Sequence, residues 1–135
     1  MAYKFYNPNP TYKEPKPGKK PKKWNKIDCT TRALCAITGK SWKDVFYAQV
    51  KTALENFDMP DSTPVFEKTL DYYSGTRHSY PRGQKRETVK IFAANHPTGK
   101  YILNLAGHVV AVIDGDYYDV WDCGNKTAYS YYEFK

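Results

Sequence analysis

The chain has 135 residues, of which 41% are hydrophobic and 26% are charged, and its formal net charge is +7. This length fits one compact domain. The sequence contains no run of about 18 apolar residues, the length that a helix needs to cross a membrane. The N-terminal stretch also lacks the apolar core of a signal peptide. The three cysteines are an odd number, so we expect free thiols in a reducing compartment and predict a cytoplasmic protein.

The positive charge is concentrated at one end of the chain. Residues 1–26 contain eight lysines and a single acid, Glu14, so they carry the whole net charge and the remainder is balanced. Prolines in residues 1–23 argue against a helix or a central strand, which predicts an extended basic arm there and a globular domain over residues 24–135. The aromatic residues through which the arm could pack on the domain are Tyr3, Phe5, Tyr6 and Tyr12. The lysines either keep the chain soluble or contact nucleic acid or another acidic partner.

Two helices are expected directly after the arm. Residues 29–37 carry an apolar stripe, which favours a helix that ends at Gly39. Asp28 precedes this helix, where a side-chain oxygen can cap free backbone N–H groups. A second helix is expected to open at Ser41, because Asp44 lies three residues on as in a capping box. Apolar residues at helical spacing then continue as far as Leu54, and they predict a face turned to the core.

Two shorter helices are expected further along the chain. One runs from Thr63 to about Tyr73 with a proline in its first turn, and the other covers residues 88–95 before a His-Pro pair stops it. Residues 74–87 between them are rich in turn formers and positive charge. They are expected to form a long exposed loop, which is either a lid or exosite or an ordinary connection.

The last third of the chain is expected to form antiparallel strands. Residues 100–105, 108–113 and 117–122 are rich in β-branched and aromatic residues and are separated by turn residues. Residues 128–134 alternate enough to form a last strand. Helices followed by a meander of strands predict an α+β fold, with N-terminal helices packed on a C-terminal antiparallel sheet.

One cysteine stands where its sulfur would be activated. A helix N-terminus supplies partial positive charge and free N–H groups, and a nearby imidazolium adds more, so a thiolate can form near neutral pH. Cys29 lies at a predicted helix start, whereas Cys35 lies inside that helix and Cys123 lies past a strand end. Cys29 is therefore the candidate nucleophile.

His108 and Asp122 are the candidate base and orienting residue. If residues 114–116 form a three-residue hairpin loop, His108 and Asp122 stand opposite each other on one face, with Cβ atoms about 5 Å apart. The carboxylate would then fix the tautomer of the ring and leave the other nitrogen for the thiol.

This pairing depends on the length of the hairpin loop. A two-residue loop at residues 114–115 would instead bring Trp121 opposite His108. The alternative role of Asp122 is that of a turn residue before Cys123. Asp119 and Asp116 are poorer candidates, because Asp119 is expected to point to the other face and Asp116 to lie in the turn.

These segments resemble papain-like cysteine peptidases. The stretch from Asp28 to Leu34 resembles the nucleophile segment of that superfamily. Residues 107–115 followed by 118–122 resemble its histidine strand and third-residue strand, closest to the bacteriocin-processing branch. Small chains of this kind are similar to proteins encoded by bacteriophages, and the resemblance spans roughly residues 24–134.

The resemblance implies an acyl-transfer mechanism without a cofactor. The Cys29 thiolate would attack a carbonyl, His108 would protonate the leaving amine, and water would resolve the thioester. The Cys29 backbone N–H and the side chain of Asn25 would donate to the oxyanion. Asn25 departs from the glutamine that the superfamily places further upstream, and an ordinary loop residue is its alternative role. Asp28 and Arg32 are expected to pair across one helical turn in a structural role.

Other chemistry has less support in the sequence. No Cys or His pair has the spacing of a structural zinc site, and no nucleotide-binding glycine motif is present. A phage origin implies a host protein as the substrate. The alternatives to a hydrolase are a catalytically inactive papain-like binding or inhibitor protein, and a nucleic-acid-binding protein acting through the arm and the basic residues of segment 77–90. The oligomeric state is left open.

Overall fold

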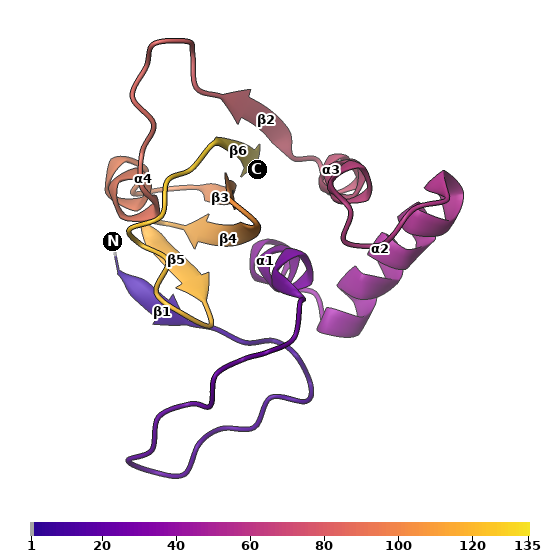
Figure 1. Cartoon of the computed structure of the whole chain (residues 1–135), viewed down its shortest axis with the longest axis vertical. Coiled ribbons are helices and arrows are strands. Elements are labelled where there is room, and N and C mark those ends of the chain that lie inside the picture. Colours follow the sequence, from indigo (N-terminus) through magenta and orange to yellow (C-terminus); the bar gives the residue numbers. More distant parts are fainter. Residues whose placement is uncertain (1) are drawn as a thin grey trace.

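The computed structural model describes residues 2–135 and has the α+β architecture that the sequence predicts. Its helices are α1 (Cys29–Thr38), α2 (Trp42–Asn56), α3 (Thr63–Tyr72) and α4 (Val89–Asn95). Its strands are β1 (Tyr3–Phe5), β2 (Thr76–Ser79), β3 (Lys100–Leu105), β4 (His108–Ile113), β5 (Asp116–Asp119) and β6 (Ser130–Phe134). The strands form one sheet in the order β1-β5-β4-β3-β6-β2 (Figure 1).

The helices begin close to the predicted positions, with one difference at α1. The Ser41 hydroxyl accepts from the Asp44 backbone N–H at 3.1 Å and caps α2, and Thr88 caps α4 in the same way. The expected cap of α1 is wrong, because the Asp28 side chain makes no cap hydrogen bond to the described residues. Its oxygens bind other side chains, which are part of the site described below.

The sheet departs from a simple meander in two places. Strands β3, β4 and β5 follow one another as antiparallel neighbours, but β6 returns to pair with β3 on the other side. The segment expected as a long exposed loop contains β2, which pairs with β6 and extends the sheet. Cross-strand pairing thus orders part of a segment whose turn-forming residues predict only a loop.

The hairpin between β4 and β5 has two loop residues. Asp114 and Gly115 both have positive φ, 48° and 83°, as a type I′ turn requires. Ile113 pairs with Asp116 and Val112 with Tyr117. The expected three-residue loop is therefore wrong, and the register is shifted by one residue. A shift of one residue turns every side chain of β5 to the opposite face.

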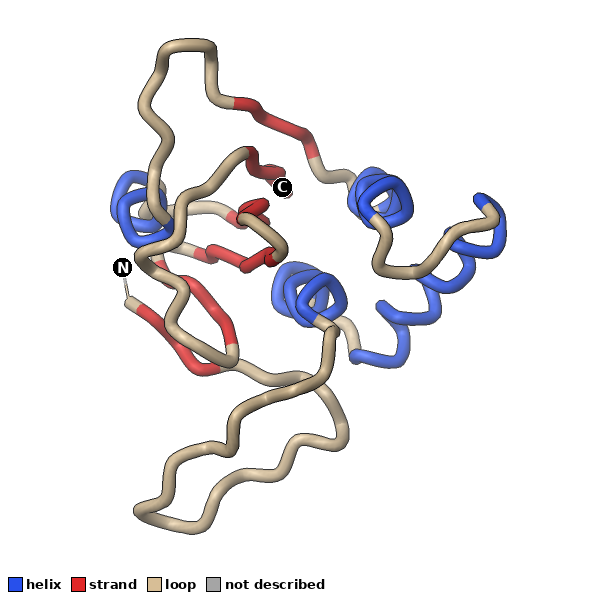
Figure 2. Tube along the Cα trace, viewed as in Figure 1, coloured by secondary structure: helices blue, strands red, loops and turns tan. Residues whose placement is uncertain are grey.

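Helices cover both faces of the sheet. Helices α1, α2 and α3 lie on one side and α4 on the other (Figure 2). Leu34 of α1 belongs to one buried cluster together with Ile102 and Val109, whereas Phe92 of α4 belongs to the other with Val110. This packing holds the start of α1 against the sheet. No helix among residues 2–135 is long and apolar enough to span a membrane.

The basic arm is anchored to the domain through its first residues. Strand β1 lies at the edge of the sheet and pairs in parallel with β5, and the Tyr6 backbone N–H donates to the Asp119 carbonyl at 3.0 Å. The chain then makes a long excursion without helix or strand and returns to α1 (Figure 1). The aromatic contacts of the arm join Tyr3 to Tyr117, Tyr6 to Tyr118, and Tyr12 to Phe5 and Trp24.

Candidate active site

Cys29 is the first residue of α1 and lines a pocket of about 270 Å³ together with His108. The helix N-terminus supplies partial positive charge at this position. The pocket wall is largely apolar, and its apolar residues include Phe66, Ile102, Leu105, Val109 and Tyr132. Its polar residues include Asn104, Ser130 and two acids, Asp61 and Glu67. Cys29 thus lies at a cleft with a largely apolar wall, and it is partly exposed to solvent.

The imidazole of His108 contacts a carboxylate and lines the same pocket as Cys29. Its Nε2 lies 2.5 Å from Asp119 Oδ2, which leaves Nδ1 as the nitrogen available to the thiol. Burial by itself would lower the pKa of His108, but hydrogen bonds to Asp119, Cys123 and Cys29 raise that pKa to about 11. The ring is therefore an imidazolium at neutral pH.

The pKa of the Cys29 thiol is shifted in the opposite direction, downward. Burial by itself would raise its pKa, but a hydrogen bond with His108 and the positive charge of that ring outweigh burial. A backbone hydrogen bond from Val109 and the charge of Arg32 act in the same direction, so the pKa of Cys29 lies below that of an ordinary thiol. A thiolate facing an imidazolium is the reactive state of a cysteine nucleophile.

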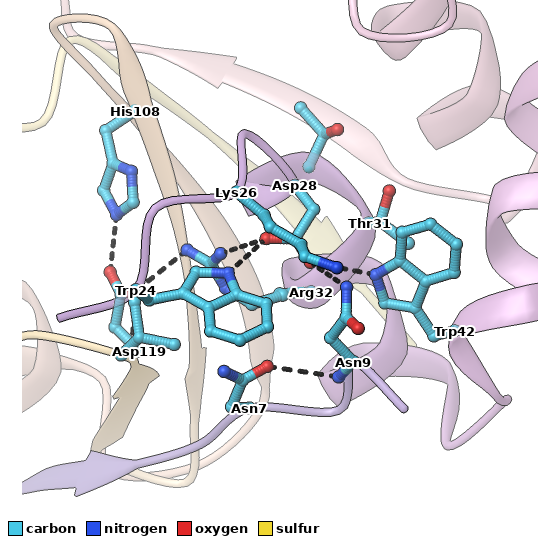
Figure 3. A network of polar contacts seen from close by, with 12 residues as sticks. Asn7, Asn9, Trp24, Lys26, Asp28, Thr31, Arg32, Trp42, His108 and Asp119 are labelled. Carbon is cyan, nitrogen blue, oxygen red and sulfur yellow. Dashed lines mark hydrogen bonds and ion pairs between the residues drawn. The ribbon is translucent and has the colours of Figure 1, made fainter. Parts of the chain in front are cut away.

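Asp119 connects His108 to a second buried carboxylate through Arg32. The residue is 3% exposed, and its Oδ1 accepts from Arg32 Nη2 at 3.3 Å and from the Val120 backbone N–H at 2.7 Å. The guanidinium of Arg32 also donates through Nη1 to Asp28 at 2.5 Å. Figure 3 shows this continuous path from His108 through Asp119 and Arg32 to Asp28. The expected Asp28–Arg32 pair is confirmed. Arg32 also pairs with Asp119, which lies outside α1.

Asp28 is the centre of a hydrogen-bond network immediately before the nucleophile. Besides Arg32, it accepts from Asn9 Nδ2 at 3.0 Å, from Trp24 Nε1 at 2.9 Å and from Trp42 Nε1 at 3.0 Å. Burial would raise the pKa of Asp28, but these donors together hold that pKa below its usual value. The carboxylate remains charged while buried, and it fixes the arm against α1 and α2 (Figure 3).

The predicted pairing of His108 with Asp122 is wrong. Asp122 is exposed, and its carboxylate accepts from the Tyr117 hydroxyl at 2.6 Å and from the Gly124 backbone N–H at 2.9 Å. It therefore occupies the turn role that was the alternative. The cause is the two-residue hairpin loop, which turns Asp119 to the face of His108 as a diagonal neighbour. The expectation that Asp119 points away from His108 is wrong for the same reason.

The alternative with a two-residue loop contained the right signal. An Asp-Gly pair flanked by strand residues is the strongest sequence indication of a type I′ hairpin. With that turn, Trp121 comes near His108, and the centroids of their rings lie 5.2 Å apart. The same register places Asp119, the last residue of β5, on the face of His108. Its carboxylate can therefore reach the imidazole.

Asn25 is exposed and lines a hollow between segments of the arm. It is not among the described residues that line the Cys29 pocket. Asn104 is among the residues that line it. Asn104 is distant from Cys29 in the sequence, so no local pattern points to it.

The other cysteines differ from Cys29 in access and pKa. Cys35 is 1% exposed and burial raises its pKa to about 12, and Cys123 is fully buried with its pKa also raised by burial. The ligand atoms of His108, Asp119 and Cys123 lie within 4.8 Å of one another and could hold a metal ion. A cation there would have to separate the 2.5 Å contact of His108 with Asp119 and recruit a thiol that burial keeps protonated.

Comparisons with known proteins do not extend these observations. No protein-family model matches the chain, and neither the search of curated proteins nor that of solved structures found a match.

Proposed function

We propose that the chain is a cysteine-dependent hydrolase of peptide, isopeptide or other amide bonds. Cys29 is the nucleophile, His108 is the acid and base, and Asp119 is the residue that positions the imidazole. The observation that carries this proposal is the combination of a pocket-lining thiol of lowered pKa with an imidazole whose far nitrogen lies 2.5 Å from a buried carboxylate. The sequence resemblance to papain-like peptidases supports the same assignment.

The proposed reaction has two acyl-transfer steps. The Cys29 thiolate attacks the carbonyl carbon, and His108 donates its Nδ1 proton to the amine as the C–N bond breaks, which leaves a thioester. Water then attacks the thioester carbonyl while His108 takes its proton. The C–S bond breaks, the acid is released and the ion pair of Cys29 with His108 is restored.

Two groups near the sulfur are proposed to stabilise the oxyanion. Cys29 is the first residue of α1, and the first backbone N–H groups of a helix have no carbonyl partner within it, so the N–H of Cys29 can donate to the substrate. Asn104 lines the same pocket, and its side-chain amide, which also donates to the Ser130 hydroxyl at 3.5 Å, is the proposed second donor in place of Asn25. Donors aimed at the developing charge typically contribute a factor of about 10² to 10³ in rate.

The decisive experiment combines thiol labelling with a substrate screen. The wild-type chain, Cys29→Ala and the matched control Cys35→Ala are treated with an alkyne-tagged iodoacetamide at pH 6, and in parallel with a mixture of peptides whose new termini are read by mass spectrometry. We expect labelling and cleavage by the wild type and by Cys35→Ala, and neither by Cys29→Ala.

Two results would contradict the proposal. Cleavage that survives in Cys29→Ala would show that Cys29 is not the nucleophile. Labelling of Cys29 no faster than that of a free thiol would show that Cys29 and His108 do not form an ion pair. Rapid labelling of Cys29 without cleavage of peptides, isopeptides or bacterial host proteins would favour an inactive papain-like binding protein.

A further inference from the structure

The loop between β1 and α1 forms two adjoining hollows of about 750 and 650 Å³. Both are lined by Lys20, Lys22, Lys23 and Trp24. The larger one continues over the arm and includes Tyr12, whereas the smaller one extends onto the domain. The residues that the domain side and β1 add to the smaller hollow are Tyr3, Phe5, Val120 and Trp121.

The charge of this surface is strongly one-sided. All the lysines that line the two hollows are exposed: Lys13, Lys16, Lys19, Lys20, Lys22 and Lys23. Glu14 is the one acid among the residues that line them, and it interacts with the Tyr12 hydroxyl. Within the described part of the chain, none of these lysines forms an ion pair of 4.0 Å or less with a carboxylate. The positive charge of the loop is therefore not neutralised by carboxylates of the described part of the chain and is available to an acidic ligand.

Aromatic rings follow the lysines along the same path. Tyr12 lies between Phe5 and Trp24, with ring centroids 5.4 and 6.3 Å away. Phe5 and Trp121 are 40% and 41% exposed although they are large and apolar. Trp121 also lies beside the ring of His108. The track of rings and charges thus runs from the tip of the arm to the edge of the candidate active site.

We propose that this track binds single-stranded nucleic acid. Lysines that follow a backbone of phosphates, together with exposed rings on which bases stack, are the two components of sequence-tolerant binding to single strands. An acidic protein would use the lysines but has no planar bases to place on Phe5 and Trp121. A duplex keeps its bases stacked on one another and likewise makes no use of those rings. Binding by this track does not require the proposed hydrolase activity.

The test measures binding of the full chain to a fluorescein-labelled single-stranded DNA of mixed sequence by anisotropy, between 50 and 200 mM NaCl. The variant changes four lysines of the track, Lys19, Lys20, Lys22 and Lys23, to Gln. A control variant changes four exposed lysines elsewhere, Lys40, Lys43, Lys51 and Lys135, to Gln, so that both variants have the same net charge. Circular dichroism melts verify that each variant is folded.

Each phosphate contact contributes roughly 0.7 to the slope of log K against log salt for single strands. The track variant is expected to lose up to about 3 from that slope, and the control to keep most of it. Phe5→Ala with Trp121→Ala is expected to weaken binding about tenfold with the salt slope unchanged, because stacking and charge act separately.

Equal loss in both lysine variants would overturn the proposal, because it would reduce the effect to net charge. Binding of poly-glutamate as tight as that of the oligonucleotide would also overturn it in favour of an acidic protein partner. Equal affinity for duplex DNA, with no effect of the aromatic changes, would overturn the assignment to single strands.

Discussion

His108 Nε2 lies 2.5 Å from Asp119 Oδ2, although strand β5 does not place the two residues directly opposite each other. The contact is a diagonal one, made after the hairpin has turned and just where β5 ends. It selects which ring nitrogen is left for Cys29, and Arg32 holds the same carboxylate from the other side. The reactivity of the thiol therefore depends on a turn that lies at the far end of the hairpin.

The first prediction separates Asp119 from Asp122. Asp119→Asn keeps the shape of the side chain but removes the negative charge that holds His108 protonated, so alkylation of Cys29 by iodoacetamide at pH 6 is expected to slow at least tenfold. Asp122→Asn weakens the contacts with Tyr117 and Gly124 and is expected to cost about 1 kcal/mol of stability with unchanged alkylation. Mass spectrometry of the labelled peptide and a urea titration measure the two effects. A slower reaction in Asp122→Asn alone would reverse the assignment.

The second prediction concerns pH. The pKa of Cys29 is lowered and that of His108 is raised to about 11, so the ion pair exists from the lowered thiol pKa upward to that of the ring. Alkylation of Cys29 is expected to be already fast at pH 6 and to show no drop near pH 6.5, where a free imidazole loses its proton. In His108→Gln, burial dominates and the rate is expected to rise only above the ordinary thiol pKa. A profile for the wild type identical to that of the variant would exclude the ion pair.

The third prediction concerns the network around Asp28. Trp24 and Trp42 donate to different oxygens of that carboxylate. Each change to Phe keeps an aromatic ring but removes one donor to a charged group, and each is expected to cost about 1.5–3 kcal/mol in the free energy of unfolding. Because both act on one buried carboxylate, the double variant is expected to deviate from additivity by at least about 0.5 kcal/mol. Urea unfolding of the four chains gives the cycle, and strict additivity would show that the two donors are independent.

The fourth prediction uses the acids of the pocket. Asp61 and Glu67 line the Cys29 pocket, in which the imidazolium of His108 is the one positive group among the described lining residues and is balanced by the Cys29 thiolate. A cationic methanethiosulfonate is therefore expected to gain rate over its anionic counterpart relative to the same pair acting on free cysteine. Asp61→Asn with Glu67→Gln is expected to lower this ratio severalfold at low salt, because the charges are close and partly screened. Glu55→Gln, an exposed acid outside the pocket, is the matched control. An unchanged ratio in the double variant would show that these carboxylates do not influence the sulfur.

Local patterns in the sequence account for the elements but not for the whole site. The helix that begins at Cys29, the cap at Ser41 and the strand that begins at His108 follow from spacing and residue type. The partner of His108 depends on the length of one turn, and a single residue of difference moved the assignment from Asp119 to Asp122. An Asp-Gly pair carries the information to choose the shorter loop, provided that turn geometry is given priority.

The network around Asp28 could not be read from the sequence. Its donors Asn9, Trp24 and Trp42 come from three separate segments, and no periodic pattern relates them to the carboxylate. The prolines and lysines of the arm predict an extended chain, but they do not reveal that the arm delivers Asn9 as one of these donors. Only tertiary structure brings such groups together, because the cost of ordering the arm is repaid by contacts with the rest of the domain.

The order of Cys29, His108 and Asp119 along the chain has a consequence for the thiol during synthesis. Cys29 leaves the ribosome long before His108 and Asp119, and a thiol without its imidazolium has ordinary reactivity. The growing polypeptide thus carries the Cys29 thiol without the imidazole that lowers its pKa until the β4–β5 hairpin has emerged and closed. Fragments that stop short of this hairpin carry the sulfur but not the means to ionise it.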